Sequence, residues 1–174
     1  MKKQGGFTLV ELMVVVSIAA LLLSWGIPSF KTWNTKHGIE NQMVQLYSDL
    51  QLGRMTGYGS KVVAGVYWAG GPSVTSYQIR SDANNNGKIS DTGIDTQIGA
   101  TVTPKYPIAV SVNQDSVSFD GRGFLNTSDP ANPATQITFS TANTSGAAID
   151  CVAVTSTRIT IGKMNATATA CNPK

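Results

Sequence analysis

A polar stretch in the middle of the chain has the residue types and spacing of a calcium-binding loop. Its candidate ligands stand at the first, third, fifth, ninth and tenth positions of such a loop and are Asp82, Asn84, Asn86, Ser90 and Asp91. In an EF-hand loop, side-chain oxygens at alternate positions converge on the ion, and the glycine at the sixth position, here Gly87, permits the sharp turn. A calcium site is therefore one interpretation of this stretch.

The same stretch also fits a turn that needs no ion. Its twelfth position holds Gly93, where a calcium loop has a bidentate glutamate, and Asp91 or Asp95 would replace that ligand only with a changed geometry. Asn, Asp and Gly are also the residues that dominate tight turns, because they tolerate left-handed backbone conformations or bond to their own backbone. A metal-free hairpin turn is the second interpretation. Apart from the calcium alternative, we expect no cofactor.

The chain has one histidine, His37, and two cysteines, Cys151 and Cys171. With no second histidine and no acid recognised beside it, His37 offers little for Ser–His or zinc chemistry, and we interpret it as a helix-surface or packing residue. The cysteines lack the C-x-x-C spacing of a redox pair and the further ligands of a zinc site. In an exported domain they predict a disulfide, worth on the order of 3 kcal/mol for a loop of about 20 residues.

A long apolar segment dominates the N-terminal part of the chain. Residues 7–27 read FTLVELMVVVSIAALLLSWGI, and about 20 apolar residues can cross a bilayer as a helix. The one charged residue in it, Glu11, costs about 2.5–3.5 kcal/mol inside the bilayer, so a functional role is the default hypothesis. Lys2 and Lys3 precede the segment, which places the N-terminus in the cytoplasm and the following domain in the periplasm or outside.

The sequence GGFTLVELMVVVSIAALLL resembles the leader and first helix of type IV pilins and type II secretion pseudopilins. The resemblance implies that a prepilin peptidase cuts between Gly6 and Phe7 and that Phe7 becomes N-methylated. It also implies that Glu11 is the assembly glutamate, and that Pro28 kinks or locally melts the helix. Other pilin or pseudopilin subunits are the implied partners, and the implied location is the bacterial inner membrane, followed by a filament.

The spacing of Phe7 and Glu11 agrees with this implication. Residues four apart share one face of a helix, and cleavage would create a positive amine at Phe7. The amine of one subunit would then pair with the Glu11 carboxylate of a neighbour in the filament. Glu11 is unpaired in the bilayer and neutralised in the filament, and this difference would favour extraction of the subunit from the membrane.

Four segments follow from these patterns: a leader (1–6), a membrane and assembly helix (7–28), an amphipathic second half of the helix (29–57) and a β-rich globular domain (58–174). The second half of the helix has an apolar stripe made by Ile39, Met43, Leu46 and Leu50. Its other side is filled by polar residues that include Gln42 and Asp49. We expect Gly53, Gly57 and Gly59 to end this helix.

Beyond the helix the period of the pattern changes to two. Strands are predicted at 61–69, 74–80, 97–102, 107–112, 115–119, 136–140, 149–155 and 158–162. One long helix followed by many short strands predicts an α+β fold, with an antiparallel sheet or small β-sandwich packed on the helix. No P-loop, nucleophile elbow or dinucleotide fingerprint is present, and we do not predict an enzyme.

The stretch FDGRGF (119–124) and the late strand pair resemble the GspH/FimT group of minor pilins and pseudopilins. Arg122 in this stretch is expected to be a solvated or backbone-bonding turn residue. The implied function is a minor pilin that helps to start or cap a filament. The alternative is a GspH-like minor pseudopilin of a type II secretion system.

A nucleic-acid receptor is the weaker alternative. Some FimT-like pilins bind DNA through a C-terminal Gly-Arg-x-Arg motif, and the matching place here reads Gly162-Lys163-Met164-Asn165, with one cation in place of two. Loss of the leader with Lys2 and Lys3 also lowers the formal net charge from +3 to +1. Because phosphate binding needs several Lys or Arg contacts, nucleic acid is not the expected partner.

Overall fold

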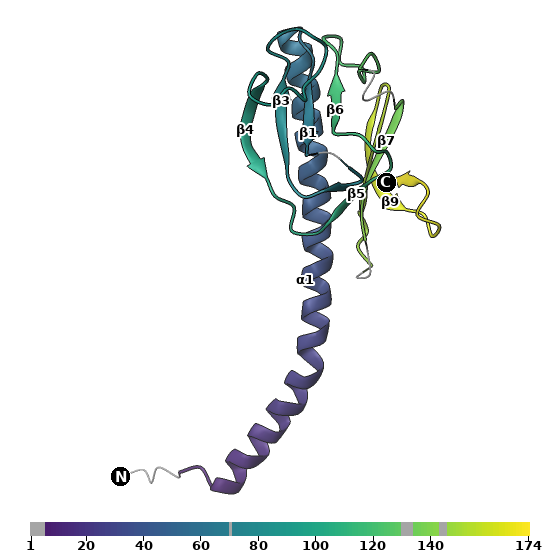
Figure 1. The fold of residues 1–174 in the computed structure, drawn as a ribbon. Helices are drawn as coiled ribbons and strands as arrows, with labels where there is room; N and C mark the ends of the chain where they lie inside the picture. The colour runs from purple at the N-terminus through teal and green to yellow at the C-terminus, as the bar shows by residue number, and fades with distance from the viewer. Residues whose placement is uncertain (1–5, 70, 130–133, 143–145) are drawn as a thin grey trace. The chain divides into compact units, whose positions relative to one another are not determined.

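The computed structural model describes residues 6–69, 71–129, 134–142 and 146–174, and of residues 25–28 it describes the backbone alone. Lys2 and Lys3 of the leader and the side chain of Pro28 therefore lie outside the described part. The chain divides into two compact units, Met1–Thr35 and Lys36–Lys174. One helix, α1 (Leu9–Ser60, 52 residues), contributes to both units, and each unit is described by itself (Figure 1).

The first unit consists mainly of the N-terminal part of α1. Its apolar side chains from Leu9 to Leu23 are exposed, and no sheet covers them within this unit. By length and composition α1 is able to cross a membrane, with a mean hydropathy of 2.2 over its most apolar stretch, none of which is buried. An apolar helix without a covering layer needs a lipid or protein environment.

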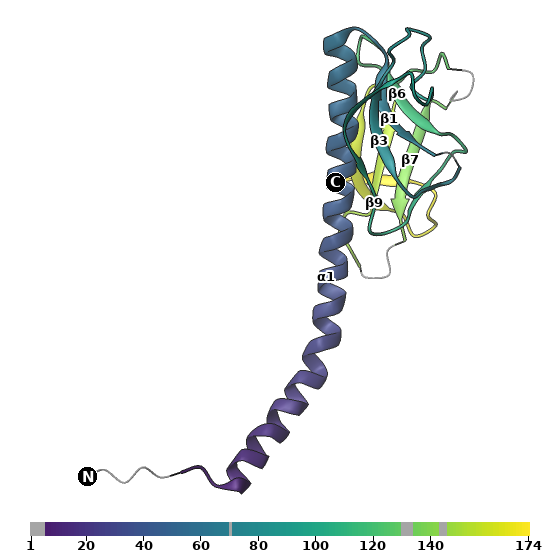
Figure 2. The ribbon, with the colours of Figure 1, turned by 60° about the vertical axis from the view of Figure 1, so that its left-hand side comes forward.

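The second unit contains the rest of α1 and two antiparallel sheets (Figure 2). The first sheet has the order β4-β3-β1-β6, and the second has the order β10-β9-β8-β7-β5-β2. The strands are β1 (Ala64–Trp68), β2 (Ser73–Val74), β3 (Tyr77–Ser81), β4 (Thr96–Val102), β5 (Ile108–Val110), β6 (Ser116–Phe119), β7 (Gln136–Thr141), β8 (Cys151–Thr155), β9 (Ile159–Met164) and β10 (Cys171–Pro173).

One hydrophobic core joins the helix to both sheets. Met43, Leu46 and Leu50 of α1 are buried in it, as the apolar stripe predicts. Trp68 of β1 and Phe139 of β7 meet edge to face across the two sheets, with their ring centroids 5.4 Å apart. The prediction of an α+β fold, in which a long helix packs with antiparallel sheets, is confirmed.

The helix ends at Ser60, one residue after Gly59 and close to the predicted end, but Gly53 and Gly57 do not interrupt it. Two of these glycines serve packing. A Cβ atom on Gly53 would lie 2.8 Å from the Cα atom of Gly65 in β1, and one on Gly57 would lie 3.1 Å from a backbone oxygen of Phe119. Glycine is therefore needed there for the close approach of helix and strands, which a single-sequence pattern cannot distinguish from a helix stop.

Two strand predictions also need correction. The single strand predicted at 74–80 is two strands, β2 and β3, which lie in different sheets. The last strand, β10, was not predicted, and it pairs with β9 between Cys171 and Met164. Its sequence, CNP, has no β-branched or aromatic residue, so no local signal marks it.

Polar contacts add to the apolar attachment of the helix. Gln42 donates from Nε2 to the carbonyl of Tyr106 (2.8 Å) and accepts the Tyr106 N–H (2.9 Å), while the Tyr77 hydroxyl donates to Asp49 Oδ2 (2.6 Å). The prediction that Gln42 and Asp49 lie on the polar side away from the sheets is therefore wrong. Polar helix residues can face a sheet where they find a partner there, and the residue types alone do not show that partner.

Candidate functional sites

The N-terminal segment holds the predicted processing and assembly residues. Beyond its chain neighbours, no described residue lies within 4 Å of the place where a Cβ of Gly6 would stand, and Phe7 is 84 % exposed. Thr8 precedes the first helical residue, and its Oγ1 accepts the backbone N–H of Glu11 at 3.2 Å. Glu11 thus lies in the first turn of α1, exposed and four residues after Phe7.

Thr8 was not predicted as a helix cap, although the sequence contains the signal. A threonine followed three residues later by glutamate is the capping-box pattern, in which the side chain satisfies an otherwise free N–H of the first turn. The negative charge of Glu11 also lies at the end of the helix where the dipole stabilises it. The helix therefore begins two residues after Phe7, close to the predicted cleavage site, with its carboxylate accessible.

The polar loop after β3 gathers most of the predicted calcium ligands. Asp82 is buried, and its carboxylate accepts the backbone N–H groups of Asn84 (3.2 Å), Asn86 (3.3 Å) and Gly87 (2.7 Å). The side-chain amides of Asn84 and Asn86 both donate to Asp91 Oδ2. Four of the five candidate residues are thus brought together, and Ser90 has no hydrogen bond to them in the described part of the chain.

Side-chain oxygens of this loop accept hydrogen bonds from the loop's own backbone. Asn84 Oδ1 accepts the N–H of Asn86, and Asn86 Oδ1 accepts the N–H of Lys88, so both amide oxygens form local turns. Gly87 has a φ of +83°, which agrees with the turn role given to it. Within the described residues, no group of three or more His, Cys, Asp or Glu side chains has metal-ligand geometry. The loop thus has some of the oxygen ligands that calcium prefers, and these oxygens also accept hydrogen bonds from the loop's own backbone.

Contacts outside the loop hold it in place. Ile89 is buried, and Asn126 donates from Nδ2 to the carbonyl of Gly87 at 2.8 Å. Lys88 Nζ lies 3.9 Å from Asp129 Oδ1. Asn126 and Asp129 follow β6, far from the loop along the chain, so no local pattern indicates these contacts.

The FDGRGF turn is organised by Asp120. Its Oδ1 accepts the N–H groups of Arg122 and Phe124, both at 2.9 Å, and its Oδ2 accepts Arg122 Nε (2.9 Å) and Nη2 (2.8 Å). Partial burial alone would raise the pKa of Asp120, but these hydrogen bonds and the Arg122 charge hold that pKa below its ordinary value. Arg122 itself is an exposed turn residue, as predicted.

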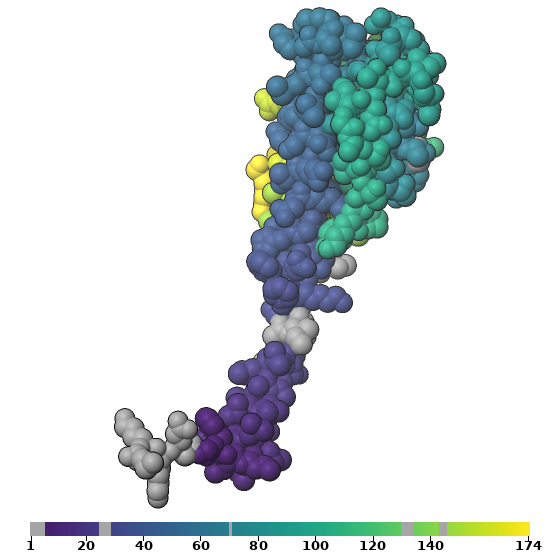
Figure 3. Space-filling model, turned by 90° about the vertical axis from the view of Figure 1, so that its left-hand side faces the viewer, coloured from purple at the N-terminus to yellow at the C-terminus, as the bar shows by residue number. Residues whose placement is uncertain are grey.

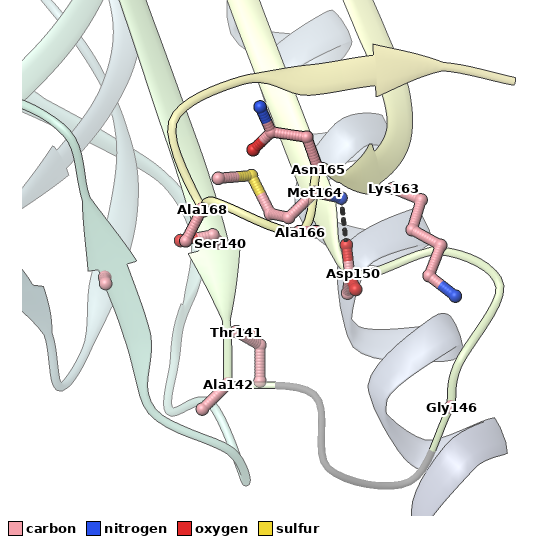
Figure 4. A pocket seen from close by; sticks show the side chains of 11 residues that line it. Ser140, Thr141, Ala142, Gly146, Asp150, Lys163, Met164, Asn165, Ala166 and Ala168 are labelled. Atoms are coloured by element: carbon pink, nitrogen blue, oxygen red, sulfur yellow. Dashed lines mark hydrogen bonds between the residues drawn. The ribbon is translucent and has the colours of Figure 1, made fainter.

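A pocket of about 490 Å³ lies beside the β9–β10 turn (Figure 4). Asp150, which is buried, accepts the N–H of Met164 at 2.7 Å inside it. Thr141 is also buried, and its hydroxyl has no partner in the described part of the chain. Asp150 and Thr141 do not form a nucleophile–base pair, and neither was singled out from the sequence. Lys163, Met164 and Asn165, which were compared with the DNA-binding motif, also line this pocket.

The C-terminal residues compared with Gly-Arg-x-Arg lie at the end of β9. Lys163 is exposed, and its backbone pairs with Asn172 of β10. Asn165 accepts the N–H groups of Thr169 (2.8 Å) and Ala170 (3.1 Å), so its side chain closes the following turn. Asn165 therefore has a structural function at the position where the DNA-binding motif has its second arginine.

The predicted disulfide is confirmed. Cys151 of β8 and Cys171 of β10 are bonded, with their Cα atoms 5.9 Å apart. The prediction that His37 has no acid partner is wrong, because His37 Nδ1 lies 3.3 Å from Glu40 Oε2, one turn later on α1. Glu40 in turn accepts the N–H of Ala148 at 2.8 Å, which ties the helix to the loop before β8.

The glycine, the exposed Phe7 and the apolar helix with its early carboxylate lie together at the N-terminus of the chain. Residues 1–27 match the family model of the prokaryotic N-terminal methylation motif. This match supports a type IV pilin-like or pseudopilin subunit, a structural protein that a prepilin peptidase processes and that assembles with other pilin subunits. No curated protein matches the chain, and no solved structure matches it.

Proposed function

We propose that this chain is a minor pilin that helps to start or cap a type IV pilus-like filament. The observation that carries the proposal is the methylation motif at residues 1–27, with Glu11 exposed in the first turn of an uncovered apolar helix. A carboxylate placed there is costly in lipid and is stabilised by a positive partner. The N-methylated amine of Phe7 in a neighbouring subunit would be that partner.

The location follows from the same features. The chain would sit in the inner membrane with its N-terminus in the cytoplasm and its sheets in the periplasm, and would then move into the filament. The Cys151–Cys171 bond supports export of the globular domain, because disulfides persist in oxidising compartments. The FDGRGF turn and the sheet arrangement support a GspH/FimT-like subtype.

A GspH-like minor pseudopilin of a type II secretion system remains the alternative, since both assemblies use the same N-terminal chemistry. Neighbouring genes would distinguish the two. A role in DNA uptake has less support, because Asn165 is used in the turn before β10 and Lys163 is the one cation at that place.

The test is the substitution Glu11→Ala in the full-length chain. We expect normal membrane insertion, cleavage after Gly6 and methylation of Phe7, as mass spectrometry would show, but loss of the subunit from sheared filaments. Ser17→Ala is the matched control, because Ser17 is exposed on the same helix and its hydroxyl is bonded internally to the Met13 carbonyl. Normal incorporation of the Glu11→Ala protein, or cleavage after Ile27, would contradict the proposal.

A further inference from the structure

The last turns of α1 carry an apolar surface that no part of the described second unit covers. Met55 is 70 % exposed and Tyr58 is 59 % exposed, and Phe124 of the FDGRGF turn is 43 % exposed. Figure 3 shows one face of the C-terminal half of α1 exposed, with the segment that contains β4 along its edge. A groove of about 370 Å³ lies there, lined by Gln51, Arg54, Met55, Tyr58, Arg122 and Gly123, and we call it the α1-end groove.

Cations border the α1-end groove. Arg54 donates from Nε to the carbonyl of Gly123 at 2.7 Å, which fixes its guanidinium against the FDGRGF turn. Lys61 Nζ lies 3.9 Å from the centre of the Tyr58 ring. The Arg122 side chain is 80 % exposed and is paired with Asp120, whereas Arg54 and Lys61 have no carboxylate partner among the described residues. The border is therefore positive, and the floor is apolar.

This combination favours a protein ligand. Tyr, Met, Phe and Arg are the residue types enriched in the cores of protein interfaces, and an aromatic or aliphatic anchor in a pocket is the usual hot spot. A nucleic acid would need cations spread along a backbone path, whereas these three surround one groove. Arg122 is already paired with Asp120, but Arg54, Lys61 and Arg122 together outweigh that one carboxylate, so charge complementarity favours an acidic ligand.

We propose that the α1-end groove docks a neighbouring subunit of a different kind, through an apolar side chain that stands next to a carboxylate. This inference rests on the proposed function, because a subunit that starts or caps a filament has other chains as its neighbours. Tyr58 and Met55 contact the apolar side chain, and Arg122 and Lys61 face the carboxylate.

Site-specific photocrosslinking of the full-length chain in its host tests the contact. A benzophenone amino acid at position 55 should give an adduct with another pilin-like subunit, identified by mass spectrometry, at about tenfold higher yield than at position 94. Ile94 is the matched control, because it is 57 % exposed and lies in the loop before β4, outside the groove. Equal yields, or adducts only with the chain itself, lipid or nucleic acid, would overturn the proposal.

Charge variants test the chemistry of the ligand. Arg122→Gln should lower the position-55 adduct about tenfold, whereas Arg122→Lys should retain most of it, because the positive charge is kept. Thermal unfolding of both variants checks that the turn stays folded. An adduct that is insensitive to the charge at position 122 would overturn the assignment of an acidic ligand.

Failure of this inference is distinguishable from failure of the proposed function. If the wild-type chain is absent from filaments, the proposed function is wrong. If the wild-type chain is incorporated, Glu11→Ala is excluded and the groove variants behave as wild type, then only the docking surface is wrong.

Discussion

Tyr77 links the first sheet to the helix through a single hydroxyl. It is buried in β3 and donates to Asp49 of α1 at 2.6 Å. Burial, followed by the hydrogen bond and the negative charge of Asp49, raises the pKa of Tyr77 well above its ordinary value of 10.0. The neutral phenol is therefore part of the folded state, because ionisation would place two negative charges together.

Stability at alkaline pH should depend on this residue. A group whose pKa is raised by folding contributes its full stabilisation below its unfolded pKa and loses it as pH rises, so the protein should lose stability above about pH 10. Tyr77→Phe should lower the unfolding free energy by about 1–2 kcal/mol at pH 7, because Asp49 loses its hydrogen-bond donor. The variant should also lose less stability than the wild type above pH 10, because it has no phenol to ionise at this place. Circular dichroism melts of both proteins in detergent at pH 7 and 10.5 would show this. Equal slopes for the two would contradict the assignment.

At the scale of elements, the approach of α1 to β1 depends on the absence of a side chain. Gly53→Ala would place a Cβ 2.8 Å from the Gly65 Cα, against backbone that cannot rotate away. We expect Gly53→Ala to lower the unfolding free energy by about 1–3 kcal/mol, although alanine favours helix formation over glycine by about 1 kcal/mol. Gly59→Ala is the control on the same helix, because it has open space and should be neutral or stabilising. Thermal melts of the pair measure the difference, and a stabilised Gly53→Ala protein would show that the contact is loose.

The loop from Asp82 to Asp95 should hold its shape without calcium. Its carboxylates already accept N–H groups of the loop, Asp82 from three residues and Asp95 from Ala83 (3.4 Å) and Asp91 (2.8 Å). Calorimetric titration of the full-length chain in detergent with calcium up to millimolar concentration should therefore give no binding heat. A saturable heat that disappears in Asp82→Asn would instead establish the calcium interpretation.

At the scale of the whole second unit, the disulfide holds the last strand. It joins β10, an edge strand of three residues, to the central part of the second sheet. Reduction, or the double substitution Cys151→Ser with Cys171→Ser, should lower the unfolding free energy by about 2–4 kcal/mol. Melts with and without reductant measure this, and the double variant should not respond to reductant. A wild-type melt that reductant does not change would mean that β10 is held by its other contacts.

The residues and their spacing determined the parts of this protein that depend on local or one-dimensional information. The apolar helix with its carboxylate, the buried stripe of Met43, Leu46 and Leu50, the helix-then-strands order and the cysteine pair were all predictable, because each depends on periodicity, length or count. The Thr8 cap belongs to the same class, and its pattern was present in the sequence.

Only the tertiary structure decided which distant residues meet. It brings Gly53 of α1 close to Gly65 of β1, and it forms the hydrogen bonds from Tyr77 to Asp49 and from Asn126 to the loop after β3. It also places β2 and β3 in different sheets. It also brought the FDGRGF turn beside the end of α1 to form the α1-end groove. These pairings depend on how the two sheets cross the helix, and a pattern of neighbouring residues carries no information about contacts that form only when segments far apart in the chain are packed together.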